Sequence, residues 1–163
     1  MSFEIDHASL LVRVPGAATL ASIERALASA DLTLGIDIAD LSVGDWLARG
    51  APGAPSSFAD PADHLVAGLT ATLANGSATI DVRPSPRRAV GPDLVALLVG
   101  CHERFASIDH VWLRVHPKTG ARRVALPTEH LDLDPPVSSE EAALLDAIAR
   151  ELARQAEHEE ERD

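Results

Sequence analysis

The chain has 163 residues, of which 46% are hydrophobic, so it is long enough for one compact domain and too short for two domains of ordinary size. Its longest apolar run, Leu94–Val99, is far shorter than the roughly 20 residues that a membrane-spanning helix needs. The first residues lack the basic and apolar regions of a signal peptide, and the single Cys101 excludes an internal disulfide. We therefore expect a cytoplasmic protein without a membrane span.

The net charge of −11 is concentrated near the C-terminus. Residues 134–163 hold ten acidic and three basic residues, a net charge of −7, which leaves −4 for the rest of the chain. The other basic residues are scattered apart from the pairs Arg87–Arg88 and Arg122–Arg123, and only 3% of all residues are aromatic. Nucleic-acid binding requires clustered cations or stacking platforms, so we exclude a nucleic-acid partner.

The first third of the chain predicts a strand, a helix and a short strand. Ser9–Val14 alternates apolar and polar residues, which is typical of a half-buried strand that ends at a Pro-Gly turn. Ala17–Ala30 has apolar residues at helical spacing, and Leu32–Leu34 fits a short return strand. The segment that follows, up to about residue 63, is rich in Gly, Pro and Ser, with a single helical turn expected near Val43–Arg49.

The middle of the chain predicts a hairpin, a helix and further strands. Asn75-Gly76 separates two β-compatible runs, His64–Ala74 and Ser77–Val82, and Asn-Gly favours a tight type I′ turn because both residues adopt positive φ. Pro92–Val99 is a predicted helix that Gly100 ends. Ile108–Val115 alternates as a strand. The chain then has a predicted turn at 116–120 and a last strand at 122–126.

A Pro-containing spacer, residues 127–137, leads to an acidic C-terminal helix, residues 138–163. Ser138 and Glu141 fit a capping box, and Leu145, Ile148 and Leu152 form an apolar stripe. The stripe covers the domain of the same chain or is presented to another chain; the sequence leaves both alternatives open. An exposed apolar face favours a partner. The predicted organisation is thus a domain over residues 1–126, the spacer and the helix.

Four segments in this order resemble the second lobe of the FAD-binding (PCMH-type) domain of the vanillyl-alcohol oxidase superfamily. They are GAATLASIERALASADLTLGI, LSVGDWLARGAPGAP, SFADPADHLVAGLTATLANGSATI and GPDLVALLVGCHERFASIDHVWLRVHP. The alkyldihydroxyacetonephosphate-synthase-like and glycolate-oxidase-like FAD-linked oxidases are the most similar branch. The resemblance covers about two-thirds of the chain, from residue 5 to residue 117. It implies an α+β fold with a mixed or antiparallel sheet and flanking helices.

The resemblance also implies which residues would contact a flavin. The family's Val-Gly-Gly loop corresponds to Val43, Gly44 and Asp45, and its later Glu-Gly segment corresponds to His102 and Glu103. The implied cofactor contacts as a set are Val43, Gly44, Asp45, Trp46, Gly50, His102, Glu103 and Ile108. No catalytic residue and no metal site are predicted. The simpler interpretation of Gly44, Gly50 and Gly53 is a pair of tight turns, and that of Trp46 is a core or interface anchor.

Several features of the family's site are changed in this sequence. Asp45 stands in place of a glycine, where a carboxylate would repel a pyrophosphate and a Cβ would hinder its approach. The family's Pro-x-Gly-Gly-Gly loop and its substrate domain have no counterpart here. We therefore expect a degenerate FAD-binding fold that acts as a non-catalytic interaction or assembly subunit, as a homo-oligomer or on a larger protein. The alternative is an FAD-dependent oxidoreductase subunit whose flavin site a partner chain completes.

Overall fold

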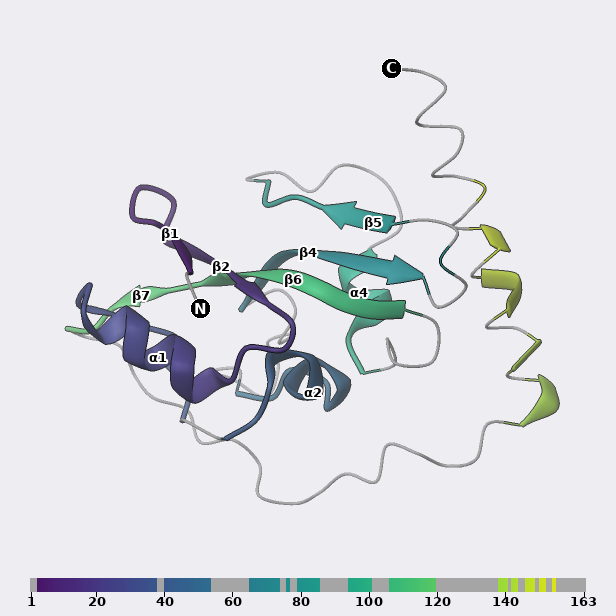
Figure 1. Cartoon of the computed structure of the whole chain (residues 1–163), viewed down its shortest axis with the longest axis horizontal. Helices are drawn as coiled ribbons and strands as arrows, with labels where there is room; N and C mark the ends of the chain where they lie inside the picture. The colour runs from purple at the N-terminus through teal and green to yellow at the C-terminus, as the bar shows by residue number, and fades with distance from the viewer. Residues whose placement is uncertain are drawn as a thin grey trace.

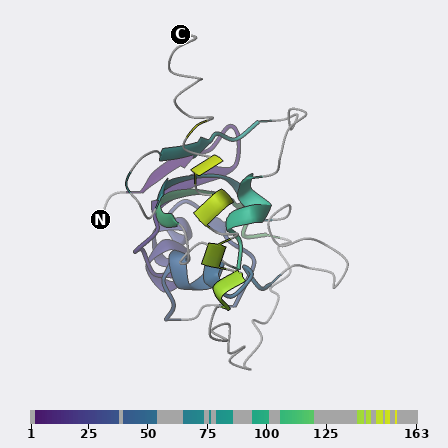
Figure 2. The same ribbon diagram turned by 90° about the vertical axis from the view of Figure 1, so that its right-hand side faces the viewer.

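A computed structural model of the chain describes the larger part of the predicted domain and part of the C-terminal helix. The residues described are 3–37, 40–53, 65–73, 76, 79–85, 94–100, 106–119, 138–140, 142, 143, 146–148, 150, 151 and 154. Figure 1 and Figure 2 show a sheet with the labelled helices on one of its sides. No helix among these residues is long and apolar enough to cross a membrane.

The main sheet has five antiparallel strands in the order β1-β2-β6-β4-β5. Its strands are β1 (Glu4–Asp6), β2 (Leu11–Pro15), β6 (Ala106–Arg114), β4 (Val66–Leu73) and β5 (Thr79–Val82). A second sheet pairs β3 (Leu32–Thr33) with β7 (His116–Pro117). The helices are α1 (Leu20–Ala28), α2 (Val43–Ala48) and α4 (Leu94–Leu98). The predicted α+β fold with an antiparallel sheet is confirmed.

Sequence alternation explains why one side of the sheet is buried and the other is open. On the helix side, the strands contribute the fully buried Val12, Val14, Leu69, Val111 and Leu113. Burial of each such side chain stabilises the fold by about 1.5–3 kcal/mol. The residues between them face the opposite side, because successive side chains of a strand alternate. The predicted strands at 9–14, 64–74, 77–82 and 108–115 are therefore confirmed over their described residues, and the ends of the first and the last are shifted.

Two features of the strands differ from the prediction. β1 was not predicted, because three residues with one apolar side chain carry too little alternation. The turn expected at 116–120 is wrong at its start, since His116 pairs with Thr33 and Pro117 pairs with Leu32. The amide of Lys118 then donates to the carbonyl oxygen of Asp31, at 2.8 Å, and extends this contact. The strand expected at 122–126 lies outside the described residues.

Helix α1 packs through the stripe that its spacing predicted. Leu20, Ile23 and Leu27 are buried against the sheet, and the Thr19 side chain caps the helix by accepting from the Ser22 amide at 3.2 Å. The same helix also buries a charged residue, Glu24, at 6% exposure. Its carboxylate accepts from the Thr33 hydroxyl at 2.6 Å and from the Leu34 amide at 3.0 Å. Glu24 thus fixes β3 to α1.

The two short helices are joined to each other. α4 ends before Gly100, as predicted, and Gly100 has a φ of +87°, which is favourable for glycine after a helix. Its amide donates to the carbonyl oxygen of Leu47 in α2 at 2.8 Å. The hairpin between β4 and β5 is also confirmed, and Gly76 in its turn has a φ of +68°. Asn75 and Pro92 lie outside the described residues.

Candidate functional site

The predicted flavin loop and the predicted flavin contact on β6 meet at a buried glycine, Gly16. Its amide donates to the carbonyl oxygen of Asp109, and its own carbonyl oxygen accepts from the Gly44 amide, both at 2.9 Å. A Cβ on Gly16 would collide with the carbonyl oxygen of Ile108. The structure therefore brings Gly44 and Ile108 together on two sides of Gly16. We call these three residues the Gly16 junction.

The backbone amides of the predicted flavin loop are all used inside the chain. The Val43 amide donates to Ala18 at 2.8 Å and the Gly44 amide to Gly16 at 2.9 Å, in each case to the carbonyl oxygen. The Asp45 amide donates to the Ser42 hydroxyl at 3.0 Å, and the Trp46 amide donates to the Ser42 carbonyl oxygen at 2.9 Å. A phosphate is bound through amide hydrogens that have no other acceptor. These four amides have internal acceptors.

Asp45 has a structural role at the start of α2. The Ser42 hydroxyl donates to the Asp45 carboxylate at 2.6 Å and accepts from the Asp45 amide. The pair satisfies polar groups at the helix N-terminus, where a carboxylate is also favoured by the helix dipole. Asp45, a predicted flavin contact, thus supports the N-cap residue Ser42 of α2.

Trp46 and Gly50 also have structural positions. Trp46 is 1% exposed, and its indole nitrogen donates to the carbonyl oxygen of Pro52 at 2.9 Å. Gly50 follows α2 with a φ of +80°, and its amide donates to Leu47 at 2.9 Å. These contacts agree with the simpler interpretation of Trp46 as a core anchor and of Gly50 as a turn residue.

The remaining predicted site residues are described only in part. His102, Glu103, Leu145 and Leu152 lie outside the described residues. Ile148 lies in a helical part of the C-terminal segment and is half-buried. The Ala142 amide donates to the Ser138 carbonyl oxygen at 2.9 Å, a helical hydrogen bond among the described residues of this segment.

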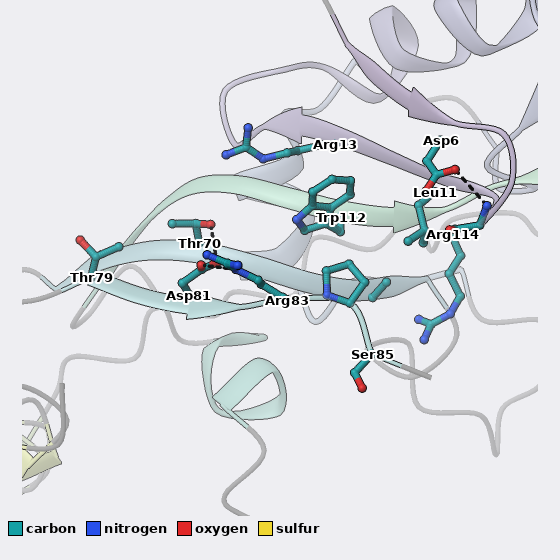
Figure 3. A pocket seen from close by; sticks show the side chains of 13 residues that line it. Asp6, Leu11, Arg13, Thr70, Thr79, Asp81, Arg83, Ser85, Trp112 and Arg114 are labelled. Carbon is teal, nitrogen blue, oxygen red and sulfur yellow. Dashed lines mark hydrogen bonds and ion pairs between the residues drawn. The ribbon is translucent and has the colours of Figure 1, made fainter. Parts of the chain in front are cut away.

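A second candidate region is the open face of the sheet, on the side opposite the helices. A hollow of about 960 Å³ lies over strands β1, β2, β6, β4 and β5. It is lined by Asp6, Ser9, Leu11, Arg13, Ala67, Thr70, Thr79, Asp81, Arg83, Pro84, Ser85, Trp112 and Arg114. We call these residues the Trp112 face, after the only aromatic residue among them. Figure 3 shows Arg13 and Arg114 on either side of Trp112 along the strands.

Two arginine side chains of the Trp112 face, Arg13 and Arg114, make different contacts. The Arg13 guanidinium lies 5.8 Å from the centre of the Trp112 ring, within the range of a cation–π contact. Arg114 donates to the Val66 carbonyl oxygen at 2.9 Å. Within the described part of the chain, Arg114 forms no ion pair with a carboxylate, and the Trp112 indole nitrogen has no acceptor.

The carboxylates of the same face already have partners. Asp81 accepts from Arg83 at 2.9 Å and from the Thr70 hydroxyl at 3.3 Å. Asp6 accepts from the amides of Ala8 at 2.9 Å and Ser9 at 3.0 Å. Hydrogen bonding from Ser9 lowers the pKa of Asp6 below its ordinary value. The face therefore offers aromatic, hydroxyl and cationic groups to a partner, a set suited to binding acidic and apolar groups.

Sequence reasoning did not identify the Trp112 face as a site. In the alternating run 108–115, His110, Trp112 and Arg114 lie on the side opposite the buried Val111 and Leu113. Arg13 reaches this side because it pairs with Trp112 across the two strands. That pairing joins residues 99 positions apart, so the spacing of one strand could not reveal it.

The fold is similar to part of alkyldihydroxyacetonephosphate synthase, in two crystal forms of that protein. Each likeness has a TM-score of 0.58 and a sequence identity of 16%, and each covers 70% of this chain. It covers 20% of the synthase chain in one form and 21% in the other, so this chain spans about a fifth of that protein's length. No protein-family model matches the chain, and no curated protein matches it in sequence.

The likeness confirms, at the level of fold, the resemblance that the four sequence segments indicated. In the sequence analysis, alkyldihydroxyacetonephosphate-synthase-like proteins belonged to the branch that these segments resembled most. The described elements from β1 to β7 have the α+β arrangement that the resemblance implied.

Proposed function

We propose that this chain is a non-catalytic binding and assembly module with a flavoprotein-type fold, and that it holds no flavin by itself. One observation supports the proposal most strongly. The backbone amides of Val43, Gly44, Asp45 and Trp46 all donate hydrogen bonds to acceptors within the chain. A nucleotide that took these donors would have to break four hydrogen bonds and uncap α2. Each hydrogen bond stabilises a fold by about 0.5–1.5 kcal/mol, so this opening is costly.

The open face supports the binding role. The Trp112 face combines a half-buried indole ring with arginine side chains, and Trp and Arg are the residues that dominate binding energy at protein interfaces. This surface lies on the side of the sheet away from the Gly16 junction and the helices. Binding through it would therefore leave the core of the domain unchanged.

A second function is favoured by one specific observation. Gly44 and Ile108, which are both predicted flavin contacts, meet at the Gly16 junction. On this alternative, the chain is a subunit of an FAD-dependent oxidoreductase, and a partner chain supplies the other wall of the flavin crevice.

Titration of the purified chain with FAD separates the two functions. We expect no binding at micromolar FAD, measured by equilibrium dialysis and by the flavin absorption band after gel filtration. The matched variant is Gly44→Ala, because a Cβ there would lie 3.5 Å from the nearest atom, the Gly16 carbonyl oxygen, which is an ordinary contact. Stoichiometric FAD in the wild-type chain that weakens in Gly44→Ala would refute the proposal and support the alternative.

A further inference from the structure

We propose that the Trp112 face binds the acidic C-terminal segment, residues 138–163, of a second copy of this chain. The inference rests on the proposed function, because it names the partner and the surface of the assembly module. It predicts a closed dimer in which each copy gives its segment and receives the segment of the other.

The Trp112 face has a cationic and partly apolar surface that is open in the described part of the chain. Leu11 and Trp112 are half-buried on the open side of the sheet. Arg13 lies over the Trp112 ring, and Arg114 lines the same face two residues further along β6. Among the described residues, the ion pair of the Arg13 side chain is a distant one, with Glu4 at 4.0 Å, and the Glu4 side chain is 69% exposed. An acidic partner would supply carboxylates for Arg13 and Arg114 and an acceptor for the indole N–H.

The C-terminal segment has the complementary chemistry. Residues 138–163 contain nine acidic and three basic residues, a net charge of −6. Leu145, Ile148 and Leu152 follow helical spacing and span about 10 Å of helix, the width of about two strand spacings of a sheet. Glu141 precedes this stripe by one turn on the same helical face. Opposite charges at the edges of an apolar contact set its orientation and favour the correct partner.

The arrangement within one chain points to a second copy as the donor of the segment. None of the described residues of the segment is among those that line the Trp112 face. Ala142, Ala143, Asp146 and Ala147 are exposed, and Figure 1 shows the described turns of the segment beyond the end of β4. Among the described residues of one chain, the segment and the Trp112 face do not meet. Residues 120–137 can reach about 60 Å when extended, which is sufficient to reach a neighbouring molecule.

Reciprocal exchange satisfies both surfaces in one closed assembly. Two copies related by a two-fold axis each bury one segment and one face, so no face is left to continue into a fibre. Salt screens the attraction between the arginine side chains of the face and the carboxylates of the segment. The dimer should therefore dissociate more readily as ionic strength rises.

Two full-length variants test the exchange. Arg114→Glu changes the face and leaves the segment intact, whereas Ile148→Asp changes the segment and leaves the face intact. The wild-type chain should be a dimer by light scattering after gel filtration, and each variant should raise the dimer dissociation constant at least about tenfold. Arg49→Glu, an exposed site on the helix side, is the matched charge control and should remain as dimeric as the wild type. Circular dichroism verifies that each variant is folded.

Mixing the two variants is the decisive step. Arg114→Glu still offers a normal segment, and Ile148→Asp still offers a normal face, so the mixture should form a heterodimer through one exchanged contact. A monomeric wild-type chain, variants that stay dimeric, or a mixture that shows no heterodimer would each overturn the exchange. These outcomes test the dimer alone. The FAD titration tests the proposed function separately, because FAD bound by the isolated chain would refute that function whatever the state of the dimer.

Discussion

Gly44 donates its amide hydrogen to the carbonyl oxygen of Gly16 at 2.9 Å, and this bond joins the start of α2 to the turn after β2. The two glycines have different steric requirements. A Cβ on Gly16 would collide with the Ile108 backbone, whereas a Cβ on Gly44 would meet only an ordinary contact at 3.5 Å. The close approach of three backbone segments therefore depends on Gly16.

Gly16→Ala should destabilise the fold more than Gly44→Ala. The added methyl group forces β2 away from β6, which we expect to lower the free energy of unfolding by about 2–3 kcal/mol. Gly44→Ala should change it by less than about 1 kcal/mol, because an alanine fits the space at the helix start. Urea unfolding followed by circular dichroism measures both. Equal stability of the two variants would contradict the steric difference.

Glu24→Ala should also be strongly destabilising. Removal of the carboxylate leaves the Thr33 hydroxyl and the Leu34 amide without this buried acceptor, so we expect a loss of about 2–4 kcal/mol. The matched control is Glu4→Ala, because Glu4 is exposed and its ion pair with Arg13 is long. The control should change stability by less than about 0.5 kcal/mol. Thermal unfolding compares the two, and a loss no greater in Glu24→Ala than in Glu4→Ala would show that the buried carboxylate does not hold β3.

Gly68→Ala should loosen the edge strand β5. A Cβ on Gly68 would collide with the carbonyl oxygen of Val82, next to an irregularity in the pairing of β4 with β6. Because β5 pairs only with β4 in the described sheet, the strain should be relieved by displacement of β5. Hydrogen exchange should become faster at the amides of β5 and remain unchanged at those of β2. Unchanged protection of β5 would show that its backbone is not held close to Gly68.

Asp6 should give the turn between β1 and β2 a dependence on acidic pH. Its pKa is lowered in the folded chain, chiefly by hydrogen bonding from Ser9, so the ionised form stabilises the fold. This contribution is present above the ordinary pKa of 3.8 and is lost as the pH falls through the lowered value. Ser9→Ala should move the pKa of Asp6 back towards 3.8, as followed by NMR titration of the carboxyl carbon. An unchanged titration in Ser9→Ala would exclude Ser9 as the main cause.

Much of the fold follows from local patterns in the sequence. Val12, Val14, Val111 and Leu113 recur at every second position, so β2, β6 and their buried side were predictable. The same holds for α1, whose apolar spacing matches its buried stripe. These signals are strong because each involves neighbouring residues in one element.

The contacts that define the sites were not predictable in this way. Sequence spacing could not show that the Gly44 amide is used by Gly16, or that Asp45 caps α2 through Ser42. The pairing of Arg13 with Trp112 likewise depends on the order of strands in the sheet. Such contacts join distant segments, and they determine which donors and acceptors remain for a ligand.

The visible absorption spectrum of the wild-type chain, purified from its native host and passed through gel filtration, is the most direct test of the central claim. A colourless chain that also fails to retain added FAD is the result that we predict, because the loop amides have internal acceptors. A stoichiometric flavin band that stays with the chain alone would contradict it.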